Sequence, residues 1–196
     1  MEDQFRSPLS RLKTSIERKT IPILGMVTTP SLSSALIKTK SSPIMVFSHI
    51  DQHPTDPDWD KSMDFMFHNI NDLNCSQCLV WIPKNKVPHR DQIKKFIEIM
   101  KKKTTSETLR IAILNPNSSI TTKLVADSLL FLQRKVGTAN GINMKFFANE
   151  EEALHHILVD PNSKNAKDIL TTIEYLFDKT MKIAKRGKNS KEQTKE

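Results

Sequence analysis

Two cysteines separated by two residues have the clearest chemical potential in this 196-residue chain. Cys75 and Cys78 have the spacing of redox pairs and of half a zinc site. In a redox pair the first thiol follows a strand and begins a helix, whose dipole lowers the pKa of that thiol. Here the pair follows an amphipathic helix pattern and enters the apolar run CLVWIP. The position therefore favours ordinary buried thiols.

A zinc site at these cysteines needs further ligands, and the nearest candidates are His49 and His53. If the strand that ends near His49 runs parallel to the strand that begins at Cys78, the two side chains lie at opposite edges of the sheet, roughly 16 Å apart at about 3.3 Å per residue. An antiparallel pairing removes this objection. We expect no metal and no cofactor.

The remaining histidines and acids form no recognised catalytic or metal-binding motif. His68 lies one helical turn from Asp64 and Asp72, which is typical of a solvated helix face. The acids between residues 51 and 60 lack the spacing and the glycine of an EF-hand, and they fit a solvated loop with a helix cap. No triad or HExxH pattern includes any of the six histidines, which are His49, His53, His68, His89, His155 and His156.

Phosphate-binding glycine loops are absent from the sequence. The four glycines, Gly25, Gly137, Gly141 and Gly187, form neither a GxGxxG nor a GxxxxGK(S/T) loop. In such loops backbone N–H groups surround the phosphates of a nucleotide. Because the sequence also shows no convergent acid, base or nucleophile, we expect a protein that is not an enzyme.

The net charge of +8 is concentrated at the two ends of the chain. Residues 1–42 hold seven Lys or Arg against three acids and residues 179–196 hold seven against two, so the middle is close to neutral at −1. Basic ends attract nucleic acid, an anionic membrane or an acidic protein, and they also occur as solvated tails without a partner. No RNP-like aromatic pair, zinc finger or helix-turn-helix accompanies the other basic group, Lys84, Lys86, Arg90, Lys94, Lys95 and Lys101 to Lys103.

Short apolar runs alternate with amphipathic helix patterns along the middle of the chain, which indicates an α/β fold. LSSALIK and PIMVFSHI face each other across KTKSSP and predict a β-hairpin, while ILGMV has the apolar content of an edge strand. Asp58 and Asn149 are predicted to cap helices, the second with an acidic first turn. Further strands are predicted at 78–83, 109–114 and 142–147, and helices at 59–73, 93–100, 120–136 and 150–157. The first of these helices is predicted to pack on the sheet through one face, which consists of Trp59, Met63, Met66, Ile70 and Leu73.

The two ends of the chain are predicted to differ in structure from its middle. A helix over about 159–185 has an apolar stripe, which either packs on its own domain or pairs with a second copy as a homodimer. Residues 186–196 have nothing apolar to anchor them and are expected to be a disordered basic tail. Residues 1–31 are expected to be a basic, Ser/Thr-rich extension. The stripe consists of Ile169, Ile173, Leu176, Phe177 and Ile183.

The cellular setting follows from what the sequence contains. Only two cysteines are present, no secretory signal is evident, and no apolar run is long enough to span a membrane. We therefore expect a soluble cytoplasmic protein.

The segment GINMKFFANEEEALHHIL, a strand that runs into a helix with acidic residues at its start, resembles the SpoIIAA-like proteins of the STAS superfamily. The resemblance covers about residues 32–158 and implies a mixed, mostly parallel sheet of four to five strands with flanking helices. In the switchable anti-sigma antagonists of that superfamily, a serine near the start of the helix after the central strand is phosphorylated. The matching region here, NKVPHRDQI, has no serine, and Asp91 stands near the matching place.

The resemblance implies a non-enzymatic protein-interaction or signalling domain in residues 32–158. The alternative is a nucleic-acid-associated accessory protein that uses its basic termini. We expect a protein partner to bind the edge formed by Lys84, Lys86, His89, Arg90, Asp91, Asn115, Ser118 and Ser119.

Overall fold

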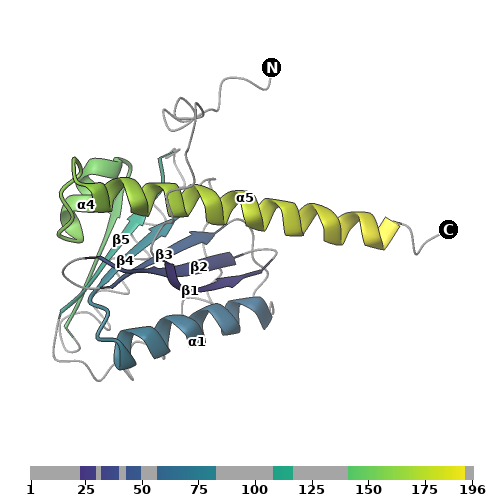
Figure 1. The fold of residues 1–196 in the computed structure, drawn as a ribbon, viewed down its shortest axis with the longest axis horizontal. Coiled ribbons are helices and arrows are strands. Elements are labelled where there is room, and N and C mark those ends of the chain that lie inside the picture. Colours follow the sequence, from purple (N-terminus) through teal and green to yellow (C-terminus); the bar gives the residue numbers. More distant parts are fainter. Residues whose placement is uncertain are drawn as a thin grey trace, which may run out of the picture.

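A six-stranded sheet with helices on both faces forms the body of the protein in the computed structural model (Figure 1). The structure describes residues 23–29, 32–39, 43–49, 57–82, 108–116 and 141–192. Its strands are β1 (Ile23–Thr28), β2 (Leu32–Ile37), β3 (Ile44–His49), β4 (Gln77–Trp81), β5 (Leu109–Leu114) and β6 (Ile142–Phe147). Its helices are α1 (Pro57–Asp72), α4 (Glu150–His156) and α5 (Lys164–Glu192). The helices predicted at 93–100 and 120–136 lie outside the described residues.

The six strands lie side by side in the order in which they occur along the chain. The pairs β1–β2 and β2–β3 are antiparallel, whereas β3, β4, β5 and β6 run parallel to one another. The predicted α/β class and the predicted hairpin, now β2 and β3, are confirmed. The sheet is mixed, as predicted, but the prediction that it is mostly parallel with four to five strands is wrong, because the sheet begins with two antiparallel pairs and has six strands.

The additional strand is β1, which lies in the segment that we expected to be an extension of the domain. It pairs with β2 after a short connection and forms one edge of the sheet. Its register shifts between Ile23 and Gly25, so that Leu24 bulges out and is 53% exposed. A bulge of this kind makes an edge strand a poorer template for pairing with another chain. The edge is therefore protected although β1 contains no charged residue.

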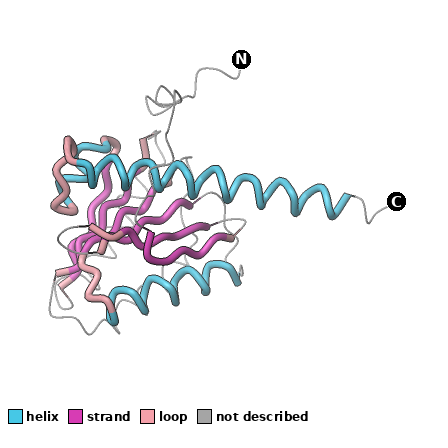
Figure 2. The backbone as a smooth tube through the Cα atoms, viewed as in Figure 1, coloured by secondary structure: helices cyan, strands magenta, loops and turns pink. Residues whose placement is uncertain are grey.

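One face of the sheet is covered by α1 (Figure 2). The helix begins at Pro57, one residue before the predicted cap, and proline is favoured in the first turn because its missing N–H has no helical partner there. Three of the residues predicted on the core face, Met63, Met66 and Ile70, are buried. They pack against apolar side chains of the sheet in one continuous core.

The way in which α1 ends explains why its buried face does not extend to Leu73, contrary to the prediction. Asn74 has a φ of 50°, and the N–H of Cys75 bonds to the carbonyl of Asn69 at 3.4 Å. This is the left-handed helix ending that asparagine and glycine favour. Leu73, which was predicted on the buried face, is 47% exposed as a result, and Cys75 is buried instead.

The opposite face of the sheet is covered by α4 and α5 (Figure 2). The predicted stripe of α5 is confirmed, because Ile169, Ile173 and Leu176 are buried in the core of the same chain and Phe177 is packed against it. Of the two alternatives for this stripe, the structure shows packing on its own domain. The helix continues past Lys185 to Glu192, into the segment that we expected to be a disordered tail.

Candidate functional site: the carboxyl-end edge of the parallel strands

The carboxyl ends of β3, β4, β5 and β6 lie along one edge of the sheet because these strands are parallel. Two backbone hydrogen bonds continue the ladder past the strand ends, from the N–H of Ile82 to the carbonyl of Leu114 and from the N–H of Asn115 to the carbonyl of Phe147, both at 2.9 Å. In open α/β sheets this edge is the usual place for ligands. We refer to it as the carboxyl-end edge.

The predicted partner-binding residues follow two neighbouring strands at this edge. Asn115 comes directly after β5, and the group that begins at Lys84 comes shortly after β4. Asn115 is only 2% exposed, so its side chain is packed inside the protein at this edge and offers almost no surface to a partner. The other predicted residues, Lys84, Lys86, His89, Arg90, Asp91, Ser118 and Ser119, lie outside the described residues.

Helix α5 runs across the sheet and past this same edge. Its Phe177 ring packs edge-on against Trp81 near the end of β4, with 5.1 Å between ring centroids. One turn later, Thr180 hydrogen-bonds with Ser33 of β2, which pairs in register with Ser48 near the end of β3. Beyond this point the helix extends well past the sheet (Figure 1).

The last part of α5, residues 184–192, is strongly basic, and we refer to it as the distal segment. It contains Lys185, Arg186, Lys188 and Lys191 against a single acid, Glu192. Like charges three and four residues apart destabilise a helix by a few tenths of a kcal/mol per pair, and Gly187 disfavours it by about 1 kcal/mol. The distal segment therefore depends on the packed part of α5 for its helical form. A basic helix of about 14 Å length results.

A row of hydroxyl groups lies under α5 close to the carboxyl-end edge. Ser33 and Ser48 are paired residues of β2 and β3, and both are fully buried. Thr180 donates its hydroxyl hydrogen to the carbonyl of Leu176, so Ser33 must be the donor in the 2.5 Å contact between Ser33 and Thr180. Among the described residues, the Ser48 hydroxyl has no hydrogen-bond partner. Two neighbouring serines of equal burial thus differ in their hydrogen bonding.

The two cysteines are buried free thiols. Cys75 donates to the carbonyl of Pro43 at 3.1 Å, and burial raises its pKa to about 11. Burial, followed by the neighbouring Cys75, raises the pKa of Cys78 well above its usual value. The parallel pairing of β3 and β4 joins Met45 with Cys78, which puts His49 at the far end of its strand from Cys78. The strands are thus parallel, which is the case in which the sequence places His49 and Cys78 far apart.

Three described histidines lie on helix surfaces, two of them facing solvent. His68 pairs with Asp72 at 2.8 Å and His155 with Glu151 at 3.8 Å, and the side chains of both pairs are more than half exposed. His156 instead covers the edge of the core, where its ring lies 5.2 Å from that of Phe147. The interpretation of His68 as part of a solvated helix face is confirmed.

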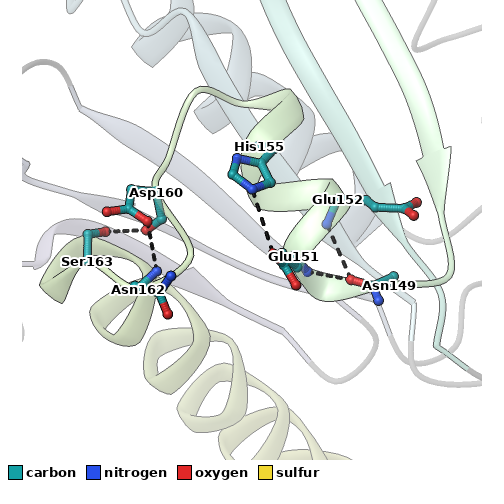
Figure 3. Close-up of polar contacts among 7 residues, drawn as sticks. All are labelled: Asn149, Glu151, Glu152, His155, Asp160, Asn162 and Ser163. Atoms are coloured by element: carbon teal, nitrogen blue, oxygen red, sulfur yellow. Dashed lines mark hydrogen bonds and ion pairs between the residues drawn. The ribbon is translucent and has the colours of Figure 1, made fainter.

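The start of α4 has the cap that the sequence predicts (Figure 3). The side-chain oxygen of Asn149 accepts hydrogen bonds from the N–H groups of Glu151 at 2.7 Å and Glu152 at 3.3 Å. The acidic first turn lies at the positive end of the helix dipole. The connection to α5 is held in a similar way, since the Asp160 side chain accepts from the N–H of Asn162 and the Ser163 hydroxyl donates to the Asp160 carbonyl.

No protein-family model, curated protein or solved structure matches this chain. Within the part of the chain that the structure describes, no helix is both long and apolar enough to cross a membrane. In that same part, no group of three or more His, Cys, Asp or Glu side chains is arranged to hold a metal ion.

Proposed function

We propose that this protein is a non-enzymatic, STAS-like interaction domain that binds an acidic protein partner at the carboxyl-end edge and along the distal segment of α5. The observation that carries the proposal is the extension of a basic helix past the edge where the loops of the parallel strands begin. The STAS-like assignment rests on the order of elements from β2 to α4. The proposed setting is the cytoplasm.

Charge complementarity is the first argument for an acidic partner. The distal segment has a net charge of +3, with four basic residues against one acid. An acidic surface placed along it removes the repulsion between these lysines and strengthens the helix that they otherwise destabilise. The basic residues that follow β4, from Lys84 onward, add charge of the same sign after an adjacent strand end.

The composition of α5 favours a protein over nucleic acid. Ile183 and Ala184 continue the apolar stripe beyond Thr180, the last fully buried residue described on the helix. A helix with an apolar stripe and basic flanks suits a partner that offers both apolar and acidic groups. A phosphate backbone uses only the charges.

The two cysteines and two of the described histidines have no role in the proposed contact. Both thiols are held in the protonated form by burial, whereas nucleophilic cysteines have lowered pKa values. His68 and His155 pair with acids on exposed helix surfaces. The proposal therefore assigns no catalytic step to these residues.

The test compares the full chain with two charge-reversed variants of α5. The variant Lys185→Glu with Arg186→Glu reverses two charges of the distal segment. The control, Lys164→Glu with Lys167→Glu, makes the same change in net charge at the exposed start of the same helix. Binding of a fluorescent Glu- and Leu-containing peptide is measured by anisotropy at physiological salt, beside a DNA duplex and an RNA hairpin.

We expect the peptide to bind the full chain and the control and to bind the distal variant at least tenfold more weakly. Nucleic acid should bind weakly, with an affinity that falls steeply as salt is added. Tight nucleic-acid binding at physiological salt, without peptide binding, would contradict the proposal. It would favour the alternative function, a nucleic-acid-associated accessory protein that uses its basic termini. Equal peptide binding by both variants would reject α5 as the contact.

A further inference from the structure

Two cationic side chains and a histidine, from three elements, lie at the outer pair of strands, away from the carboxyl-end edge. The register of β5 and β6 pairs Arg110 with Asn143 and Ala112 with Lys145. Because side chains two residues apart in a strand share a face, Arg110, Asn143 and Lys145 lie on the same face as Ala112. Ala112 belongs to the core under α4, so this is the face that α4 covers.

Helix α4 adds His156 to this group. Its Nε2 atom lies 3.1 Å from the carbonyl oxygen of Asn143. A carbonyl only accepts hydrogen bonds, so Nε2 carries the hydrogen and Nδ1 is the nitrogen that remains to be protonated. Burial, and then the charges of Lys145 and Arg110, lower the pKa of His156. Arg110 is the register partner of Asn143, and Lys145 lies two residues from Asn143 on the same face, so both cations lie near the residue that the His156 ring contacts.

The group has no acidic partner in the described part of the chain. Neither Arg110 nor Lys145 makes an ion pair or a side-chain hydrogen bond there. The acid of α4 that pairs with a histidine, Glu151, pairs with His155. Arg110 is partly buried, and a partly buried guanidinium costs free energy unless a partner compensates its charge. A bound anion would remove this cost.

We infer that Arg110, Asn143, Lys145 and His156 bind a phosphate-type oxyanion carried by a small molecule. Two permanent cations match the double charge of phosphate, and the planar guanidinium of arginine presents paired N–H donors that fit two phosphate oxygens. The Asn143 amide lies on the same face and supplies neutral donors. The inference is independent of the proposed partner surface, because Arg110 and Asn143 lie near the amino ends of their strands.

The test follows the histidine side chains of the full chain by NMR during pH titrations in sodium chloride, inorganic phosphate and sulfate at equal ionic strength. Sulfate keeps its double charge across the titration, and glycerol 3-phosphate distinguishes a phosphomonoester from free phosphate. We expect either oxyanion to raise the pKa of His156 by about one unit relative to chloride, since a nearby opposite charge favours the protonated form. His155, exposed on the outer side of the same helix, is the internal control and should not shift.

Variants identify the residues responsible. Arg110→Gln and Lys145→Gln should each abolish most of the shift, whereas Lys38→Gln, at an exposed position after β2, should leave it unchanged. If Arg110→Gln does not fold, Lys145→Gln gives the same test, because Lys145 is exposed on the edge strand. The inference is overturned if chloride and the oxyanions give the same His156 titration, or if the shift persists in Lys145→Gln.

Discussion

Replacing Ser48 with alanine should stabilise the protein, although Ser48 is fully buried and packed under α5. Its hydroxyl has no hydrogen-bond partner in the part of the chain that the structure describes, so there folding removes the hydroxyl from water without a replacement hydrogen bond. The paired residue on β2, Ser33, has the same burial but donates to Thr180. Ser33→Ala is therefore a matched control with the opposite expected sign.

The magnitudes follow from these two environments. An unsatisfied buried polar group costs about 1–3 kcal/mol, which Ser48→Ala removes. Part of this stabilisation is offset, because the missing oxygen atom also removes van der Waals contacts in the packed core. Ser48→Ala should therefore raise the free energy of unfolding by about 1 kcal/mol. Ser33→Ala removes a hydrogen bond that contributes about 1 kcal/mol and should lower the free energy of unfolding by that amount. For a chain of this length, each change corresponds to about 2–4 °C in Tm.

The assay is urea denaturation of both variants and the parent, followed by tryptophan fluorescence. Trp81 reports on the region because it lies in the register row of Ser48 and contacts Phe177 of α5. Equal m-values would show that the native and unfolded states remain comparable. If Ser48→Ala lowers stability as much as Ser33→Ala does, the Ser48 hydroxyl has a partner and the reasoning is refuted.

Three further outcomes are expected. Asn149→Ala should lower the free energy of unfolding by about 1 kcal/mol through loss of the α4 cap, while Asn162→Ala, which also replaces an exposed asparagine, should change it little in the same urea assay. Because the pKa of His156 is lowered by folding, its contribution to stability is present above the ordinary histidine pKa of 6.5 and is lost as pH falls below that value. The thermal stabilities of the parent and of His156→Gln should therefore diverge between neutral pH and pH 5, as measured by melting in chloride buffers. At pH 8 the native Cys75 thiol should react with iodoacetamide about 100-fold more slowly than in the urea-unfolded chain, because its pKa rises from 9.0 to about 11, and equal rates would contradict its burial.

The elements that could be predicted from sequence are those with strong local signals. β5 and β6 lie at the predicted residues because each is a short apolar run with clear boundaries, and the Asn149 cap is formed within its own turn. The edge-strand content of ILGMV is visible in the sequence, but the sequence places this segment outside the 32–158 domain, because its pairing with β2 depends on tertiary structure in a segment rich in Ser, Thr and Pro. Residues 186–196 are predicted to be disordered because they have nothing apolar to anchor them, whereas in the structure α5 continues to Glu192 from a part of the helix that is already anchored on the sheet.

The candidate sites show a similar division. Asn115 could be placed at a strand end from sequence, but its near-complete burial could not, because that depends on neighbouring strands and helices. Arg110 and Lys145 do not stand out in the sequence, because each lies within a largely apolar strand pattern. The usable signal is a charged residue inside a predicted strand that is otherwise largely apolar. Their meeting with His156 requires the β5–β6 register and the position of α4, which periodicity does not determine.

The order of strands has a consequence for how this chain emerges from the ribosome. Each new strand finds its partner in the strand made immediately before it, so the sheet can grow from its amino-terminal edge as synthesis proceeds. The helix that covers β2 and β3, however, is made after all six of these strands. At typical translation speeds, the apolar face that includes Ile37 and Val46 stays uncovered for on the order of ten seconds before α5 has been synthesised. A nascent chain halted before residue 164 would expose that face and become a substrate for chaperones.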